Sequence, residues 1–567
     1  MKNSEINSKL MESEIGLIIL KIIDGEIKTK RELNEEKRKL SERLHLDRFI
    51  RNSEILRYAK GDQRDAVLKV LQKKPARTMS GIIVVAAMTQ PSPCPHGKCM
   101  YCPGGVDIKT PQSYTGGEPA ARRAIQHGFD PYLQVTFRIC QLKEIGHPVD
   151  KCDLIVMGGT LTSQCIDYQM WFVRRCLEAM NEFTKNYEFI EEHGRENFLE
   201  IYNNNIYKIN KNNNKFHRFK YLEEVQEENE SADVRCVGIT FEPRPDWAKC
   251  TEIDYMLGFG VTRVEIGVQN PYDFIYKRVN RGHTVSDVVE ATQQLKDSGL
   301  KVCYHIMPGL LGYEPEIDLA GFKRVFFEDE FKPDMIKFYP LIIIKDTEYY
   351  DMWKRGDFEP INTQQAVDII IKAKEMMPKW VRTMRIMRDV PSNLIEAGIK
   401  SSNLGEIVYS EMEMRNLTCR CIRCREAGRF LARGITPNSD NIQLIREDYT
   451  ASGGVEIFLS YEDVENDILI GFLRLRIPGN PHRREIDHRS GIVRELHVYG
   501  PMVEIGEKPG YEFQHRGYGA ELLKEAERIA REDYDMNKIL VISGIGVREY
   551  YRKFGYRRDG VYMGKGI

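Results

Sequence analysis

The chain has 567 residues, 42% of them hydrophobic and 29% charged, and its net charge is −1. This length exceeds what one hydrophobic core serves, so three or four domains are expected. No segment approaches the roughly 18 uninterrupted apolar residues that a membrane span requires. The apolar patch Ile15–Ile23 is interrupted by Lys21 and lacks a small-residue cleavage site, which argues against a secretory signal. We therefore expect a cytoplasmic protein that does not contact membranes.

Residues 1–75 are predicted to be helical, because Leu, Ile and Val recur at spacings of three and four between charged residues. The segment Lys37–Arg77 contains 13 Lys or Arg and only 5 Asp or Glu, whereas the rest of the chain is acidic. A basic segment on an otherwise acidic protein is typical of a phosphate-binding surface. Charge alone fits a solvated helix with mixed charges equally well.

Residues 76–400 contain short β-rich runs that alternate with amphipathic stretches such as Ser286–Ser298. This alternation predicts a parallel sheet with helical crossovers, curled into a partial (β/α)6 barrel. Ligands in such folds bind at the carboxyl ends of the strands. The six runs are Gly81–Ala87, Asp153–Gly158, Val234–Thr240, Thr262–Val268, Lys301–Met307 and Met335–Leu341.

Three cysteines, Cys94, Cys99 and Cys102, directly follow the first predicted strand in the pattern C-x4-C-x2-C. Three thiolates in so short a loop can ligate three irons of a 4Fe–4S cluster and leave the fourth iron open to a small molecule. On this motif alone, a zinc site with His96 as the fourth ligand remains an alternative.

Residues 181–232 break the alternation of strands and helices. They contain Asn203–Asn205, the run Lys211–Lys215 and the acidic run Glu223–Glu230. This composition predicts a mobile surface insertion without a catalytic role.

A second cysteine motif lies in residues 401–437, which are expected to link two domains. The chain has 13 cysteines, an odd number that favours a reducing compartment and metal ligands over disulfides. Cys419, Cys421 and Cys424 follow the pattern C-x-C-x2-C, which brings three thiolates together as zinc prefers. The sequence does not identify the fourth ligand that tetrahedral zinc requires.

Residues 438–567 are predicted to form a mixed α/β domain. The expected elements are strands at Val455–Ser460, Asp467–Arg476, Ile492–Tyr499 and Ile539–Ser543, and helices at Tyr518–Arg531 and Arg548–Phe554. A glycine-rich turn, Gln514–Gly519, precedes the longer helix. Free N–H groups and the positive end of the helix dipole at such a turn can bind a pyrophosphate.

The cysteine loop and its α/β array resemble the radical S-adenosylmethionine superfamily. The usual spacing there is C-x3-C-x2-C, and one member family carries the longer spacing found here. The glycine-rich turn and Tyr550–Tyr556 resemble GNAT-type acetyltransferases. The combination, together with Arg494–Gly500, resembles the family of Elongator catalytic subunits over residues from about 40 to the C-terminus, apart from the insertion.

This resemblance implies a tRNA carboxymethyluridine synthase that acts on the wobble uridine in the anticodon stem-loop, with a 4Fe–4S cluster, S-adenosylmethionine and acetyl-CoA as cofactors. A deoxyadenosyl radical would take hydrogen from the acetyl methyl group, and the resulting carbon radical would add to uridine C5. Hydrolysis of the thioester would leave a carboxymethyl group. Archaeal members of the family act without the partner Elongator subunits.

The resemblance also assigns residues to each cofactor. Cys94, Cys99 and Cys102 match cluster ligands, and the basic N-terminal segment is expected to bind tRNA. Lys151 and Tyr550 are the candidate catalytic residues, and Tyr550 is chosen over Tyr551 because adjacent helical positions point about 100° apart. The matches to acetyl-CoA contacts are Lys151, Glu495, Leu496, His497, Val498, Gly517, Tyr518, Gly519 and Tyr550.

Two other functions are open. A protein lysine acetyltransferase with a scaffolding iron–sulfur domain would need a carboxylate base near the acetyl group, and Glu495 is the candidate to test. A non-catalytic tRNA-binding factor would use the basic segment equally well but has no need of an open iron.

Overall fold

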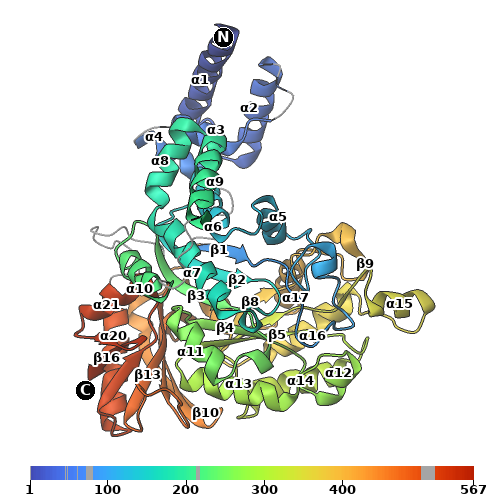
Figure 1. Ribbon diagram of the computed structural model, residues 1–567, viewed down its shortest axis with the longest axis vertical. Coiled ribbons are helices and arrows are strands. Elements are labelled where there is room, and N and C mark those ends of the chain that lie inside the picture. The colour runs from blue at the N-terminus through green and yellow to red at the C-terminus, as the bar shows by residue number, and fades with distance from the viewer. Residues whose placement is uncertain are drawn as a thin grey trace. The chain divides into compact units, whose positions relative to one another are not determined.

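The computed structural model describes residues 2–44, 46, 49–59, 62–71, 81–211, 218–499 and 517–567 (Figure 1). The chain divides into two compact units, which are described separately below. The first comprises Met1–Ile83 and Thr136–Lys151, and the second comprises Val84–Val135 and Cys152–Ile567. In the described part of the chain, no helix is both long and apolar enough to cross a membrane.

The first unit contains four N-terminal helices: α1 (Lys2–Ile23), α2 (Lys30–Arg43), α3 (Asn52–Tyr58) and α4 (Asp62–Leu71). Ile15, Ile18, Ile19 and Ile22 recur at helical spacing on α1 and are buried in a core that α2, α3 and α4 complete. Helix α2 begins at a capping box, in which the Thr29 side chain accepts the N–H of Glu32 while the Glu32 carboxylate accepts the N–H of Thr29.

A seven-stranded sheet forms the first half of the second unit. Its strand order is β1-β2-β3-β4-β5-β6-β8, and the pairs from β3 to β8 are parallel. The six predicted strands appear as β1 (Ile83–Met88), β2 (Lys151–Met157), β3 (Arg235–Phe241), β4 (Arg263–Gln269), β5 (Lys301–Ile306) and β6 (Met335–Phe338). The prediction missed a seventh strand, β8 (Arg382–Ile386), because its five residues include two arginines and show no apolar run.

Helical crossovers cover the outer face of this curled sheet (Figure 1). They include α7 (Ile166–Asn181), α11 (Cys250–Gly258), α12 (Asp273–Arg278), α13 (Val285–Asp297), α14 (Pro315–Phe327) and α16 (Thr363–Glu375). After β6, a separate two-stranded sheet pairs β7 (Ile342–Ile344) with β9 (Ile395–Gly398), and α15 (Glu348–Arg355) follows β7. Sequential strand order with helices between neighbours is the arrangement of a partial parallel barrel.

The described residues of 181–232, which the sequence predicted to be a mobile surface insertion, are helical. They form α8 (Phe183–His193), α9 (Arg195–Lys211) and α10 (Arg218–Asn229). Phe183, Tyr187 and Ile190 are buried at helical spacing on α8. Helix α10 packs on α7, and the Asn181 side chain donates a 3.0 Å hydrogen bond to the Val225 carbonyl. The asparagine and acidic runs had obscured this apolar periodicity.

A second seven-stranded sheet forms the C-terminal half of this unit, in the order β10-β11-β12-β13-β14-β16-β15. Its strands are β10 (Ile442–Ala451), β11 (Gly454–Asp463), β12 (Ile468–Ile477), β13 (Ser490–Val498), β14 (Lys538–Val541), β15 (Arg557–Asp559) and β16 (Tyr562–Gly566). Neighbouring strands in this described sheet pair antiparallel, except that β13 and β14 are parallel. The amphipathic helix α20 (Tyr518–Glu532) buries Leu522, Leu523 and Ala526 against this sheet, and α21 (Arg548–Arg552) follows β14.

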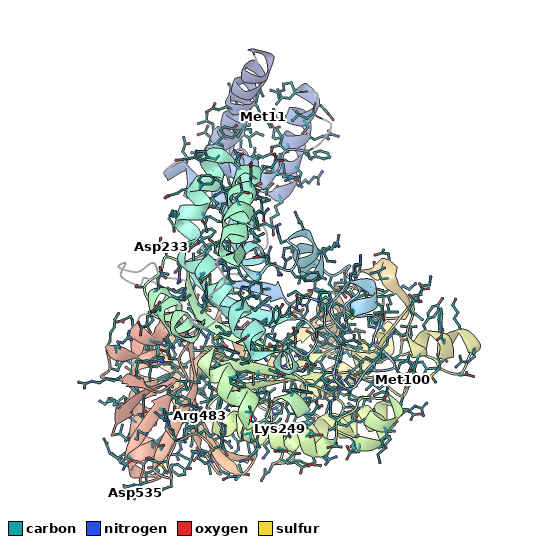
Figure 2. The ribbon with its side chains drawn as sticks, viewed as in Figure 1. Met11, Met100, Asp233, Lys249, Arg483 and Asp535 are labelled. Carbon is teal, nitrogen blue, oxygen red and sulfur yellow. The ribbon has the colours of Figure 1, made fainter. Side chains whose placement is uncertain are left out.

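The C-terminal sheet contacts the parallel sheet at the amino ends of its strands. Arg494 donates to the Leu300 carbonyl directly before β5, and Tyr562 donates to the Ser298 carbonyl. On an outer helix, Asp254 of α11 accepts a 2.8 Å hydrogen bond from Arg483. Arg483 follows β12 and is labelled in Figure 2. The carboxyl ends of the parallel strands therefore remain available for a separate site.

Candidate functional site

The first cysteine motif lies in the loop that follows β1, at the carboxyl edge of the parallel sheet. There the N–H of Thr89 donates to the Met157 carbonyl at the end of β2, so both strands end at this edge. Cys99 and Cys102 are buried, and Cys94 is half-buried. The three cysteines thus lie directly after the first strand, as the sequence predicted.

A cavity of about 170 Å³ opens beside these cysteines. It is lined by all three of them and by residues at or just beyond the ends of successive strands: Met157, Glu242, Gly267, His305, Tyr339 and Arg385. This is the carboxyl-edge position at which parallel α/β folds bind their ligands.

The donor set suits a 4Fe–4S cluster better than one zinc ion. A single tetrahedral zinc, with Zn–S distances of about 2.3 Å, would draw its sulfur ligands into close contact. The sulfurs of Cys94, Cys99 and Cys102 do not all lie within 4.8 Å of one another. A cluster binds each thiolate to a different iron and tolerates this wider spacing. His96 Nδ1, Tyr101 Oη and Arg281 Nε are buried in the same region without hydrogen-bond partners, as expected where a polar group binds.

His96 does not complete a zinc site. Its Nε2 lies 3.1 Å from the Cys99 sulfur, within hydrogen-bonding distance. Burial and the nearby positive charges of Arg244 and Arg281 lower the pKa of His96 to about 4, so the imidazole is neutral near pH 7. A neutral His96 with its proton on Nε2 donates to the sulfur and leaves Nδ1 unprotonated.

A buried charge network extends to the wall of the cavity, which includes Glu242, Glu265 and His305, and sequence reasoning missed it. Glu265 on β4 accepts a 3.2 Å hydrogen bond from Arg263 and lies 2.9 Å from His305 Nε2. It also pairs with Lys337, which contacts Glu242 at 3.1 Å. Burial alone would raise the pKa of Glu265, but Lys337 and the other cations outweigh it and lower this pKa well below its usual value. Alternate charged residues within buried strands, as in Arg263-Val264-Glu265, were the available signal.

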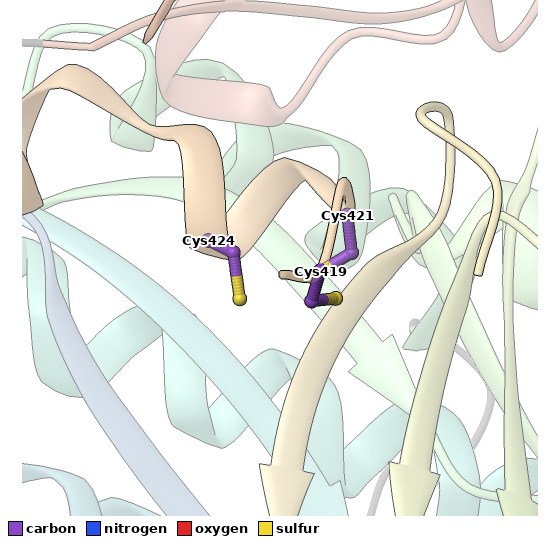
Figure 3. A group of neighbouring side chains, drawn as sticks. All are labelled: Cys419, Cys421 and Cys424. Carbon is purple, nitrogen blue, oxygen red and sulfur yellow. The ribbon is translucent and has the colours of Figure 1, made fainter. Parts of the chain in front are cut away.

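The second cysteine motif forms a compact group immediately before and within the short helix α18 (Ile422–Arg425), which follows α17 (Leu404–Met414). The sulfurs of Cys419, Cys421 and Cys424 all lie within 4.8 Å of one another (Figure 3). The fully buried Lys374 donates to the Cys424 sulfur at 3.6 Å. No fourth Cys, His, Asp or Glu ligand joins this group within the described ranges.

In the C-terminal sheet, β13 and β14 diverge. They pair in parallel only from Ser490 to Val493, whereas β13 continues through Glu495, Leu496, His497 and Val498 alongside β12. The edge of these four residues that faces away from β12 therefore has no strand partner among the described residues. Their backbone N–H and C=O groups on that edge are available to a ligand.

The N-terminus of α20 lies next to this divergence. Gly517 is the N-cap of α20 with φ +93°, a backbone conformation that favours glycine. A Cβ at Gly519 would lie 2.8 Å from Tyr550 Oη and 3.7 Å from the Val498 side chain. Tyr550 is half-buried at this position, and its neighbour Tyr551 packs in the core of the sheet. Gly517, Gly519, Val498 and Tyr550 are thus brought together, and Tyr518 starts the helix beside them.

Other predicted residues lie elsewhere. Residues 500–516, which include Gln514 of the glycine-rich turn, are outside the described residues. Lys151 is the first residue of β2, so it lies at the opposite end of that strand from the cysteine loop. Its ammonium is 3.7 Å from the Asp150 carboxylate, and its side chain is partly exposed.

Glu495 is not a free carboxylate. It accepts a 2.9 Å hydrogen bond from Arg474. Burial alone would raise the pKa of Glu495, but Arg474 and Lys301 outweigh burial and lower it. A carboxylate held in this way is a weak proton acceptor.

Comparison with known proteins identifies the family. Three family models match: the ELP3 N-terminal domain at residues 11–79, the Radical SAM superfamily at 92–320 and the Radical_SAM C-terminal domain at 333–414. A tRNA uridine(34) acetyltransferase from Methanocaldococcus infernus is 50% identical over 99% of this chain and 100% of its own length. Human Elongator complex protein 3 is 39% identical over 98% of this chain and 97% of its own length.

A solved structure agrees. The archaeal Methanocaldococcus infernus Elp3 with an N-terminal deletion superposes with a TM-score of 0.71 and 47% identity, covering 86% of this chain and 99% of that one. The curled parallel sheet and the C-terminal domain are therefore shared features, and the chain belongs to the Elongator complex protein 3 family of radical S-adenosylmethionine proteins.

Proposed function

We propose that this protein modifies the wobble uridine of tRNA, converting it to 5-carboxymethyluridine with acetyl-CoA as the carbon source and S-adenosylmethionine as the radical source. The names of its relatives, tRNA uridine(34) acetyltransferase and Elongator complex protein 3, support this substrate. The observation that carries the proposal is that one compact unit contains both the cysteine cavity and the diverging β13 strand beside α20.

The cysteine cavity is the proposed radical site. Cys94, Cys99 and Cys102 would hold a 4Fe–4S cluster, and the cavity beside them would receive S-adenosylmethionine. When bound, these groups supply a reductively generated carbon radical. The protein's own residues position the ligands: Gln112 donates to the Cys102 sulfur at 3.3 Å, and residues at the strand ends form one wall of the cavity.

The diverging strand is the proposed acetyl-CoA site of a GNAT-type domain. The unpaired edge of Glu495–Val498 would pair with the pantetheine amides, in the way that a peptide strand extends a sheet. Gly517 and Gly519 would bring the pyrophosphate close to the N–H groups and positive dipole end of α20. The phenol of Tyr550 lies beside Gly519, where it could donate a hydrogen bond to the thioester. Lys151 is a further proposed acetyl-CoA contact.

The Cys419, Cys421 and Cys424 group would hold a structural zinc ion. Its sulfurs lie as close together as one tetrahedral ion requires. The buried Lys374 supports this assignment, because three thiolates on Zn²⁺ carry one net negative charge that its ammonium would neutralise.

The basic N-terminal segment would bind the tRNA phosphates, and the protein would act in the cytoplasm without other Elongator subunits. A lysine acetyltransferase fits less well, because the carboxylate of Glu495 is already paired with Arg474. A purely tRNA-binding factor gives no reason for buried cysteines beside a cavity.

Nucleoside mass spectrometry tests this proposal. Reconstituted protein, tRNA, acetyl-CoA, S-adenosylmethionine and a reductant are incubated without oxygen, and we expect 5-carboxymethyluridine to appear. Replacing Cys94, Cys99 and Cys102 with Ala should abolish the product and the reductive cleavage of S-adenosylmethionine. Full cleavage activity in the triple variant would reject the proposed radical site.

A further inference from the structure

Cys99 differs from the other two cysteines of its loop in the groups that contact its sulfur. His96 Nε2 lies 3.1 Å from the Cys99 sulfur, and Arg281 Nη1 donates to it at 3.6 Å. The Cys102 sulfur meets the neutral Gln112 amide at 3.3 Å and the Ser113 hydroxyl at 3.7 Å. The Cys94 sulfur lies 3.8 Å from the neutral Thr160 hydroxyl. Among the described residues, Cys99 is the one cysteine of this loop whose sulfur a cationic side chain contacts.

Arg281 is fixed in this position by its surroundings. It is 7% exposed, its Nη2 donates to the Gly267 carbonyl at 2.6 Å, and its own carbonyl accepts a 2.8 Å hydrogen bond from Arg244. A Cβ on Gly267 would lie 2.6 Å from Nη2, so glycine is required for this close approach. Among the described residues, no carboxylate lies within 4.0 Å of this guanidinium. Its Nη1 lies 3.6 Å from the Cys99 sulfur, which would carry negative charge when bound to iron.

The unusual length of the cysteine loop explains how His96 reaches the Cys99 sulfur. The loop has four residues between Cys94 and Cys99, and His96 is one of them. Its Cβ lies 2.6 Å from where a Cβ on Gly282 would be, and Gly282 has φ +74°. The residue that follows Arg281 must therefore lack a side chain for His96 to reach the sulfur. The longer loop and the Arg281–Gly282 pair together bring two N–H donors to one sulfur atom.

These contacts favour the reduced state of a cluster bound through Cys99. Reduction adds one negative charge to the cluster, and a buried cation with few other partners stabilises the more negative state. Hydrogen bonds to the sulfurs are a main determinant of iron–sulfur reduction potentials. Donors and positive charge at the sulfur therefore raise the potential and make the cluster easier to reduce.

We propose that His96 and Arg281 form a pair that raises the reduction potential of the cluster by donating to the Cys99 sulfur. The inference depends on the proposed cluster and adds a role for two residues outside its ligand set. Both act through Cys99 and are positioning residues for electron transfer into the site.

The test is a potentiometric titration of the reconstituted full-length protein, followed by electron paramagnetic resonance. His96→Leu removes the donor, and Arg281→Met removes the charge. In each variant, the ratio of reduced to oxidised cluster at a fixed potential should fall at least tenfold, which corresponds to about 59 mV for a one-electron couple. Arg281→Lys, which keeps the charge, should recover part of the loss. Arg278→Met, an exposed position on α12, is the matched control and should leave the potential unchanged.

The outcomes separate this inference from the proposal beneath it. If wild-type protein binds no 4Fe–4S cluster after reconstitution, the proposed radical site itself is wrong. If the cluster forms and both His96→Leu and Arg281→Met titrate at the wild-type potential, the pair has no such role. Should Arg281→Met fail to retain iron, the His96→Leu potential decides, because the half-buried His96 contacts the Cys99 sulfur directly.

Discussion

Arg494 and Asp334 form a bidentate ion pair between the two sheets of the second unit. Arg494 Nη1 and Nη2 donate to the Asp334 carboxylate at 2.8 and 2.5 Å, and both side chains are fully buried. Asp334 directly precedes β6, and Arg494 lies on β13, one residue before the unpaired edge that begins at Glu495. The pair therefore fixes the C-terminal sheet against the amino ends of the parallel strands.

Breaking this pair should destabilise the protein strongly. Asp334→Asn leaves Arg494 buried without its main counter-charge, and loss of one partner of a buried ion pair costs about 3–5 kcal/mol. Arg494→Met should also destabilise the protein, because it removes the bidentate partner of Asp334 and leaves only the longer contacts with Lys296 and Arg474, at 3.8 and 3.7 Å. The double variant should lose less than the sum of the two, as measured by urea unfolding. Additive losses in the double variant would show that the two residues act independently.

The glycine at position 519 should be required for acetyl-CoA binding. Gly519→Glu places a bulky, negatively charged side chain where the pyrophosphate is proposed to bind, so affinity measured by calorimetry should fall at least 100-fold. Lys524→Glu, an exposed charge reversal one turn further along α20, is the control and should bind within about threefold of wild type. Both variants should retain iron, because the cysteine loop follows β1 of the parallel sheet, whereas α20 packs on the C-terminal sheet. Wild-type affinity in Gly519→Glu would place the ligand elsewhere.

The phenol of Tyr550 should matter more for the reaction than for binding. Tyr550→Phe keeps the ring and removes the hydroxyl that lies near Gly519. We expect acetyl-CoA affinity to change less than threefold and tRNA modification to fall at least tenfold. Tyr551→Phe, in the core, is the matched control and should keep modification activity. Equal activity of Tyr550→Phe and wild type would exclude a role for this hydroxyl.

Metal analysis of the purified protein should find one zinc per chain in addition to iron. Replacing Cys419, Cys421 and Cys424 with Ser should remove the zinc and leave the iron, because the cluster ligands are in a different loop. Lys374→Met should weaken zinc retention during dialysis against a chelator, since the charge of three thiolates would no longer be balanced. Purified protein that contains iron alone would contradict this assignment.

The sequence predicted elements that have strong apolar patterns and sites whose residues are neighbours in the chain. All six apolar strand runs became strands. The first cysteine motif lies in the loop after β1, and the second lies just before and within α18, with its three sulfurs within 4.8 Å of one another. Strand β8, with the sequence RTMRI, and β10, with exposed polar residues along one face, were missed because tertiary pairing decides them.

Residues that the fold brings together from distant segments could not be read from spacing. The contact of Arg281 with Cys99 joins two loops of the barrel, and the contact of Glu265 with His305 joins the neighbouring strands β4 and β5. The divergence of β13 from β14 could not be predicted from the sequence either, because it depends on the residue at which their parallel pairing ends. The helices of residues 183–211 show the opposite error, in which composition outweighed a real helical periodicity.

The measurement that tests the central claim most directly uses acetyl-CoA whose methyl group carries deuterium. If that methyl group supplies the new carbon of the modified uridine through radical chemistry, its C–H bond must break and deuterium must appear in 5′-deoxyadenosine. We predict labelled 5′-deoxyadenosine together with 5-carboxymethyluridine in the tRNA. Simple acetyl transfer never breaks that bond. Modified tRNA accompanied by unlabelled 5′-deoxyadenosine would contradict the radical route and favour the acetyltransferase alternative.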